Sequence, residues 1–347
     1  GLSYVIDVFK RRIRPERNFI DYGLFVSFFP LLVAGPIERA GHLLPQLKRL
    51  RRFDHRQSVD GLKQILWGMF KKVVIADTCA RYVNAVFDSP AGLPGSAYLV
   101  ASILFAVQIY GDFSGYSDIA LGTARLLGIE LLRNFAYPYF SRSVAEFWRR
   151  WHISLSTWFR DYLYIPLGGS KVGWGKKIRN VFIIFLLSGF WHGANWTFIC
   201  WGALNALYIL PSFMLNTNRH HLDIVAKDRA APTAKELASM AATFALTVFA
   251  WIFFRSNSLP AAFTCIRRIF SCSLFAPFPT LHLQRYFIIP LAGFFITEWF
   301  GREEPYAIAR MGLGWPRVWR WVAYYAIFFY ISYFSSYAPQ QFIYFQF

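Results

Sequence analysis

Two histidines in apolar sequence are the side chains best suited to acid–base chemistry. His192 lies in a run of 39 residues, 180–218, that contains no Asp, Glu, Lys or Arg. Gly189 and Gly193 flank it and would let the backbone or a substrate approach closely. A titratable group in such surroundings costs free energy and therefore marks a candidate functional site, and a neutral imidazole can accept a proton from a hydroxyl group. His192 is accordingly the first catalytic candidate.

The second candidate, His152, lies in a segment with helical spacing. Between 144 and 162 the aromatic and apolar side chains recur at the intervals of one helix face, namely Trp148, His152, Leu155, Phe159 and Tyr162. The pattern predicts one helix over 144–162, and it predicts a membrane interface because Arg149, Arg150 and Arg160 do not all fit in hydrocarbon. A lone histidine on an apolar face is more often a core residue, so the spacing alone leaves the role of His152 open.

A third polar cluster, 108–122, reads QIYGDFSGYSDIALG and carries Asp112, Tyr116 and Asp118. We expect its two central glycines to interrupt the helix and to free backbone groups, which is tolerated only against protein or a water-filled cavity. Two interpretations stay open. The carboxylates either end one helix and begin another at an interface, or they line a tunnel and orient a histidine.

The composition is that of a polytopic membrane protein. Hydrophobic residues make up 56% of the chain and charged residues only 16%, whereas soluble proteins carry about 25% charged residues. The net charge of +18 comes from short basic groups between apolar runs. This distribution is what the positive-inside rule predicts for cytoplasmic loops, so it argues against nucleic-acid binding. The four cysteines have no CxxC or ligand spacing, so neither a metal site nor a disulfide framework is expected.

The elements that must position these residues are helices. By length and lack of charge we expect membrane crossings in 96–111, twice in 180–218, in 237–254 and in 321–347, with 286–297 as a marginal candidate. The run 22–37 contains two prolines and predicts a re-entrant or bent span, and 62–87 predicts a helix packed inside protein. Soluble loops are expected at 42–60 and 219–235, the second with two solvated histidines.

The histidines and the polar cluster belong to motifs that resemble a known family. The run EFWRRWHISLSTWFRDYLYIPLGGS, followed by LLSGFWHGANWTFICWG, resembles the membrane-bound O-acyltransferase (MBOAT) family, within it the bacterial branch of alginate O-acetyltransferase membrane subunits and teichoic acid D-alanyl transferases. FFPLLVAGPIER, QIYGDFSGYSDIALG, VFAWIFFRSNSLPAA and the closing FIYFQF match as well. The resemblance covers essentially the whole chain, 1–347, as one membrane domain. The family's usual N-terminal helices are expected to be missing before LSYVIDV.

The resemblance implies an all-α fold, a multi-helix bundle around a central acyl-transfer funnel with re-entrant and interfacial helices. The family's signature histidine, in a Trp-His-Gly context, falls on His192, and its second functional histidine, in an Arg-Trp-His-x-Ser-Leu context, falls on His152. Both are therefore implied to be catalytic. The residues expected to line the tunnel or to orient these groups are Asp112, Tyr116, Asp118, Trp151, Trp191 and Asp161.

The implied function is that of an O-acetyltransferase in the bacterial cytoplasmic membrane. It would move acetyl groups from a cytoplasmic thioester donor, acetyl-CoA or another acyl thioester, toward an exported alginate-like polysaccharide, with a periplasmic SGNH-hydrolase-like partner and no bound cofactor. Arg149, Arg150 or Lys176 would hold the anionic donor or act only as topology charges.

Two alternatives to acetyl transfer stay open. A D-alanyl transferase of the teichoic acid type is the enzymatic one. A non-enzymatic transporter is the other, since intramembrane Asp and His residues suit a proton relay. Transporters commonly contain internal repeats, however, and none is visible in this sequence.

Overall fold

The computed structural model describes residues 1–89, 92–277, 285–335 and 342, and within these ranges the chain is helical, without a strand. The α-helices are α1 (Leu2–Phe9), α2 (Phe19–Val26), α3 (Ala40–Lys48), α4 (His55–Met69), α5 (Asp77–Phe87), α6 (Gly95–Leu126), α7 (Val144–Arg150), α8 (Ile153–Phe159), α9 (Trp174–His192), α10 (Trp196–Met214), α11 (Ala234–Arg255), α12 (Leu259–Ile269), α13 (Ile288–Phe300) and α14 (Arg317–Ser335). The all-α expectation is confirmed.

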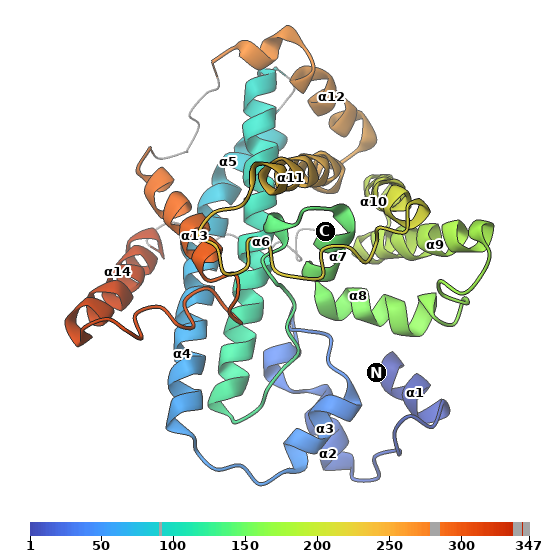
Figure 1. Cartoon of the computed structure of the whole chain (residues 1–347), viewed down its shortest axis with the longest axis vertical. Helices are drawn as coiled ribbons and strands as arrows, with labels where there is room; N and C mark the ends of the chain where they lie inside the picture. Colours follow the sequence, from blue (N-terminus) through green and yellow to red (C-terminus); the bar gives the residue numbers. More distant parts are fainter. Residues whose placement is uncertain (90–91, 278–284, 336–341, 343–347) are drawn as a thin grey trace.

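The long helix α6 runs through the middle of the molecule, with α4 and α5 packed along it (Figure 1). It continues through 108–122 without interruption, so the expected helix break at the glycines is wrong. Those glycines instead permit close helix packing. A Cβ on Gly115 would lie 2.7 Å from the carbonyl oxygen of Gly68 in α4, and one on Gly111 would lie 3.1 Å from that of Lys71. The missing side chains therefore serve backbone approach, not helix termination.

The expectation of an internally packed helix in 62–87 is confirmed. Helices α4 and α5 are joined without a turn by a π-helical segment, Phe70–Ala76. Val74 and Ile75 of this segment are fully buried. The same segment carries Lys71 and Lys72, and their position against α6 explains how charged residues fit into an interior helix.

The uncharged run 180–218 forms the helix pair that the sequence predicts. Helices α9 and α10 lie side by side (Figure 1) and are joined by a turn at 193–195. Asn195 caps α10 by accepting a hydrogen bond from the backbone N–H of Thr197 over 3.1 Å. Helix α9 begins at Trp174, so three basic residues enter its first turns.

Three of the described helices have the length and apolar composition to cross a membrane, and they are α6, α10 and α11. Helix α11 thus has the length and composition of the crossing predicted in 237–254. The predicted run 286–297 forms the shorter apolar helix α13. The run 321–347 forms part of α14 and then leaves the described residues, as does the closing motif apart from Phe342.

Two peripheral predictions are corrected in their boundaries. The segment 42–60 is largely helical, because α3 and α4 enter it from both sides and leave only 49–54 as a connection. The segment 22–37 is bent as expected, with α2 followed by a short 3₁₀ turn, Phe29–Leu31. The segment 219–233 is a loop as predicted, and its histidines, His220 and His221, are exposed.

Candidate active site

His152 lies at a break between two helices, which corrects the single helix expected over 144–162. Helix α7 ends at Arg150 and α8 begins at Ile153. The backbone of His152 is in the left-handed region, with φ 41° and ψ 55°. This conformation costs a residue other than glycine on the order of 1–2 kcal/mol. The apolar periodicity continues through the break, so the spacing alone does not reveal it.

A segment that begins at Asn134 holds the break in place. The backbone N–H of Ile153 donates to the carbonyl oxygen of Asn134 over 2.8 Å, and that of Ala136 donates to the carbonyl oxygen of Arg150 over 3.0 Å. The two hydrogen bonds bracket the residues between the helices. They offset the backbone strain at His152 and fix where its ring is presented.

The side chain of Asn134 joins the same network from a fully buried position. Its Oδ1 lies 3.3 Å from Nδ1 of His152 and accepts a hydrogen bond from the Ser154 hydroxyl over 2.6 Å. Its Nδ2 donates to Oγ of Ser117 in α6 over 3.1 Å. Oγ of Ser154 in turn accepts from the backbone N–H of Ile37 over 2.9 Å. Segments far apart in the sequence therefore meet around the His152 imidazole.

His192, by contrast, lies among aromatic rings. It is the last residue of α9 and is half-buried. Its ring centroid is 5.4 Å from that of Trp201 and 5.0 Å from that of Phe254, both in edge-on geometry. Phe198 lies at 6.4 Å. Helices α10 and α11 thus supply the packing that places this imidazole, and α9 supplies the helix end from which it projects.

Trp191 connects the two histidines. Its ring centroid lies 6.4 Å from that of His152 and 5.1 Å from that of His192. The two imidazole centroids are therefore no further apart than the sum of these distances, about 11.5 Å. The separation stays below the limit of about 15 Å that a shared substrate-sized site allows. The structure brings together the two histidines that the motifs select.

A cavity of about 340 Å³ opens beside His152. Phe113, His152, Trp191 and the segment 31–38 contribute to its wall. The volume is at the lower end of the range, about 300–1,000 Å³, that is usual for small-molecule sites. The FFPLLVAGPIER motif thus forms part of the wall of the cavity that His152 also lines, which gives it a place in the site.

Both aspartates of the polar cluster form ion pairs with lysines of the π-helical segment. Asp112 lies 2.8 Å from Nζ of Lys72, and Asp118 lies 2.5 Å from Nζ of Lys71. Gln64 also donates to Asp118 over 2.8 Å. These contacts attach α6 to the π-helical segment between α4 and α5. The expected role of the aspartates in orienting a histidine stays a prediction, while Asn134 is the residue that contacts His152.

The other tunnel candidates lie at different places. Trp151 is buried and stacks on Phe147, next to His152 in the chain. Tyr116 packs against Phe342 with ring centroids 5.2 Å apart. Asp161 lies 3.5 Å from Arg39 in an ion pair, in a π-helical segment that follows α8. No group of three or more His, Cys, Asp or Glu is placed to hold a metal ion among the residues that the structure describes.

Sequence reasoning missed Asn134 and Glu298. Glu298 is buried in α13 and accepts hydrogen bonds from Tyr110 over 2.5 Å and from Trp67 over 3.3 Å. It is an ionisable residue in an apolar run, so the rule that singled out His192 could have found it. Asn134 carries no charge and no spacing signal, and only the tertiary structure reveals its contacts.

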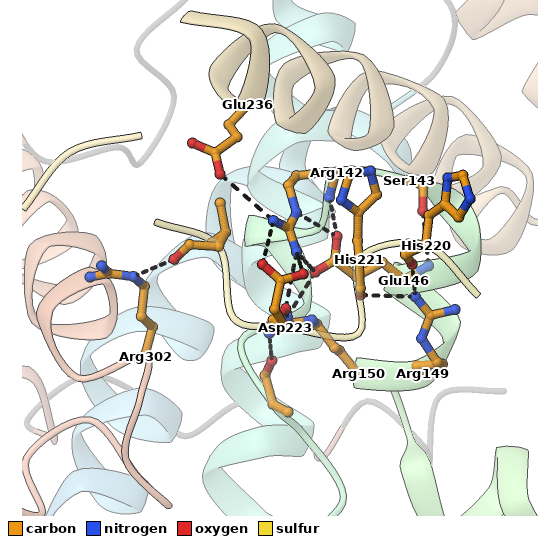
Figure 2. Close-up of polar contacts among 12 residues, drawn as sticks. Arg142, Ser143, Glu146, Arg149, Arg150, His220, His221, Asp223, Glu236 and Arg302 are labelled. Atoms are coloured by element: carbon orange, nitrogen blue, oxygen red, sulfur yellow. Dashed lines mark hydrogen bonds and ion pairs between the residues drawn. The ribbon is translucent and has the colours of Figure 1, made fainter. Parts of the chain in front are cut away.

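Three arginines that precede His152 in the chain, Arg142, Arg149 and Arg150, bind the loop 218–223 (Figure 2). Arg149 donates to the carbonyl oxygens of Asn218, His220 and His221 over 2.6, 2.8 and 3.1 Å. Arg142 and Arg150 each bind both Glu146 and the backbone of Asp223.

The same contacts have an electrostatic consequence. The hydrogen bond from Arg142 lowers the pKa of the Asp223 carboxyl below its usual value. The arginines considered as donor-binding or topology charges thus attach a loop to α7, the helix directly before His152.

The model of the membrane-bound O-acyltransferase family matches residues 8–253, a range that contains both histidines and the helices that position them. The chain belongs to the membrane-bound O-acyltransferase family. It is therefore a membrane protein, in agreement with its apolar helices.

Relatives within this family are similar over most of the chain. The probable alginate O-acetylase AlgI of Pseudomonas aeruginosa is 40% identical over 276 residues, which is 78% of this chain and 50% of that protein. The peptidoglycan O-acetyltransferase of Helicobacter pylori is 39% identical over 72% of this chain and 46% of that protein. The teichoic acid D-alanyltransferase of Bacillus subtilis is 29% identical over 53% of this chain and 49% of that protein. The chain thus spans about half the length of the curated relatives it matches.

Proposed function

We propose that this protein is an O-acetyltransferase that transfers acetyl groups from a thioester donor to a hydroxyl group on the way to an exported glycan. The observation that carries the proposal is the pair of imidazoles that both lie near Trp191, one of which, His152, lines a cavity of about 340 Å³ together with Trp191. Neutral imidazoles among aromatic rings suit proton transfer at an ester-forming centre.

The chemistry follows from that arrangement. An imidazole, with His192 as the first choice, takes the proton of the acceptor hydroxyl while its oxygen attacks the thioester carbonyl carbon. The tetrahedral intermediate collapses, the carbon–sulfur bond breaks, and the imidazolium returns the proton to the departing thiolate. Hydrogen-bond donors near the carbonyl oxygen would stabilise its transient negative charge. The second histidine, His152, either shares this proton transfer or positions the acceptor.

The relatives favour acetyl transfer over D-alanyl transfer. The two O-acetylating relatives are 40% and 39% identical over more than seven-tenths of the chain, and the D-alanyltransferase is 29% identical over 53%. One of the former is named for alginate and the other for peptidoglycan. We therefore propose that the acceptor belongs to a glycan pathway and that the donor is acetyl-CoA or a related thioester. We also propose that the protein crosses the bacterial cytoplasmic membrane several times and works with a periplasmic SGNH-hydrolase-like partner.

The test is acyl transfer in membrane vesicles that contain the protein. Vesicles are supplied with radiolabelled acetyl-CoA, and label in glycan or protein acceptors is followed over time. In parallel, D-alanine is supplied as a carrier-bound thioester. Transfer of acetyl but not D-alanyl groups, abolished by His192→Ala, is expected. D-alanyl transfer without acetyl transfer would indicate the D-alanyl transferase. Transport of a solute across the vesicle membrane, without transfer of either acyl group, would indicate the transporter.

The matched control is Arg219→Ala. Arg219 lies in the exposed loop after α10, so this variant should transfer acetyl groups at nearly the wild-type rate. All variants are compared at equal amounts of folded protein, measured by expression and by stability in detergent. Normal acetylation by a well-folded His192→Ala protein would remove the central claim.

A further inference from the structure

The hydrogen bonds of Ser154 determine which atom of Asn134 faces His152. The backbone N–H of Ile37 can only donate, so Oγ of Ser154 accepts that hydrogen bond, which is 2.9 Å long. The hydroxyl hydrogen of Ser154 is then available for Asn134, 2.6 Å away. The 2.6 Å separation is typical of an O–H···O hydrogen bond and shorter than the usual N–H···O range, so the Asn134 atom that receives the hydroxyl hydrogen is the amide oxygen. The amide nitrogen is directed to Ser117 instead.

The orientation of this amide has a consequence for the imidazole. The same amide oxygen lies 3.3 Å from Nδ1 of His152. A carbonyl oxygen only accepts, so Nδ1 must carry the hydrogen. In a neutral imidazole the other nitrogen, Nε2, then holds the free lone pair. Nε2 is on the far edge of the ring from Asn134, and the ring lines the cavity beside Trp191.

We propose that Asn134 is a positioning residue that fixes His152 as the Nδ1–H tautomer and so presents Nε2 as a proton acceptor toward the cavity. The tautomer follows from the contacts themselves, whereas its use in acyl transfer rests on the function proposed above. Free imidazole populates both tautomers, so holding one of them keeps every molecule of the protein ready for proton transfer.

The backbone of Asn134 supports the same assignment. Its carbonyl oxygen accepts from Ile153, so one residue holds both the main chain and the ring of the strained position. A fully buried amide with both of its polar atoms bonded has little freedom to rotate. The ring orientation and the tautomer are thereby set together.

Behind Asn134 lies a group of charged residues that the amide separates from His152. A small polar cavity of about 20 Å³, sufficient for one water molecule, is lined by Asn134 and by Lys71, Asp118, Arg133 and Glu298 among others. Asn134 thus contacts His152 on one side and lines this charged cavity on the other.

The tautomer can be measured directly in the intact protein by ¹⁵N NMR of selectively labelled histidine, in detergent or in nanodiscs. Protonated and unprotonated ring nitrogens differ widely in chemical shift, and His152→Gln identifies the signals by their disappearance. We expect Nδ1 of His152 to be protonated and Nε2 unprotonated at neutral pH. The reverse assignment, or a mixture of both tautomers, overturns the inference whatever the protein transfers.

Two substitutions connect the tautomer with activity. Asn134→Leu has a similar size but no acceptor, so we expect mixed tautomers and KM little changed. We expect kcat to fall by about 10- to 100-fold, the size of effect seen when the hydrogen-bond partners of metal-binding histidines are removed. Asn134→Asp keeps an acceptor oxygen for His152 and for Ser154, and the Ser117 hydroxyl can rotate to donate to it. This variant should restore the Nδ1–H signal and most of kcat.

Asn180→Leu is the matched control. Asn180 is equally buried, but its amide donates to the carbonyl oxygen of Leu167, in the segment that precedes α9. It should lower stability in detergent without changing the His152 signals. If Asn134→Leu does not fold, the wild-type spectrum still gives the tautomer of His152, and Asn134→Asp still tests whether an acceptor oxygen at position 134 maintains it. A protein with the expected tautomer but no acyl transfer would contradict the proposed function and leave the positioning role of Asn134 intact. Full activity in a folded Asn134→Leu protein would contradict that positioning role.

Discussion

The surroundings of His152 and of His192, two imidazoles that share Trp191, differ in what holds each ring. His152 is buried, lies in a left-handed backbone conformation and is bracketed by main-chain and side-chain bonds from Asn134. His192 is half-buried at a helix end and packs edge-on against Trp201 and Phe254. Hydrogen bonds fix the direction of a ring closely, and aromatic packing fixes its position.

This difference predicts different responses to mutation. The orientation of a ring that is held by hydrogen bonds, as in His152, should change when a single hydrogen-bonding atom is removed. A ring held by packing should respond to changes of volume. The orientation of the His152 ring should therefore depend on Asn134, and the position of the His192 ring should depend on Trp201 and Phe254.

The largest expected effect is that of His192→Ala. If His192 is the general base, acetyl transfer should fall by roughly 10²–10⁴-fold, and the half-buried site should tolerate alanine without loss of folding. The rate of labelled acetyl transfer at equal protein amounts measures this. A loss confined to KM would instead indicate that His192 only binds the acceptor.

His152→Ala should cause the next largest loss, and residual activity should remain if the residue only positions the acceptor. Alanine keeps a Cβ in the left-handed backbone conformation and removes the imidazole that contacts the buried Asn134 amide, so stability in detergent should fall as well. Single-turnover rates and melting temperatures together separate these contributions. Equal and complete losses in both histidine variants would indicate that His152 shares the proton transfer and that the two rings act as one unit.

Phe254→Leu tests the aromatic side of the comparison. An aromatic pair contributes about 0.5–1.5 kcal/mol beyond its buried area, and about 1.36 kcal/mol corresponds to tenfold in rate. We therefore expect roughly a two- to tenfold lower kcat and unchanged ¹⁵N signals of His152.

The control for that variant is Phe294→Leu, an equally buried ring that packs on Trp67. It should destabilise the protein without the same change in kcat. If both variants lower kcat alike, packing against His192 has no special role in transfer.

The smallest expected effect concerns the loop that the arginines attach to α7. The pKa of Asp223 is lowered in the folded protein by its hydrogen bond with Arg142. Its contribution to stability is therefore present above the ordinary carboxyl pKa, 3.8, and is lost as the pH falls below that value toward the lowered pKa. Because the Asp223 side chain is 62% exposed, the contribution should stay below about 1 kcal/mol.

Melting temperatures between pH 6 and pH 3 measure this contribution. Asp223→Asn should lose less stability over this range than the wild type does, and Asp228→Asn in the same exposed loop is the matched control. Identical pH dependence in the wild type and in Asp223→Asn would show that the contact with Arg142 does not stabilise the loop.

The sequence by itself determined the membrane class, the all-α fold and the two histidines. Long runs without charge have few alternatives to helices in a membrane, because backbone polar groups must be bonded internally. The pair α9 and α10 and the helix α11 follow from this rule with little reference to the rest of the chain. His192 stands out by the same physics, because a titratable group in apolar sequence costs free energy and therefore marks a candidate functional residue.

Only the tertiary structure decided where the helices break and what orients His152. The periodicity over 144–162 continues through the break at His152, because the break depends on hydrogen bonds from 134–136, which are remote in sequence. The glycines of 108–122 signal flexibility in the sequence but serve close packing of α6 on α4. Asn134 carries no local signal, because an uncharged amide acquires its role from the partners that folding brings to it.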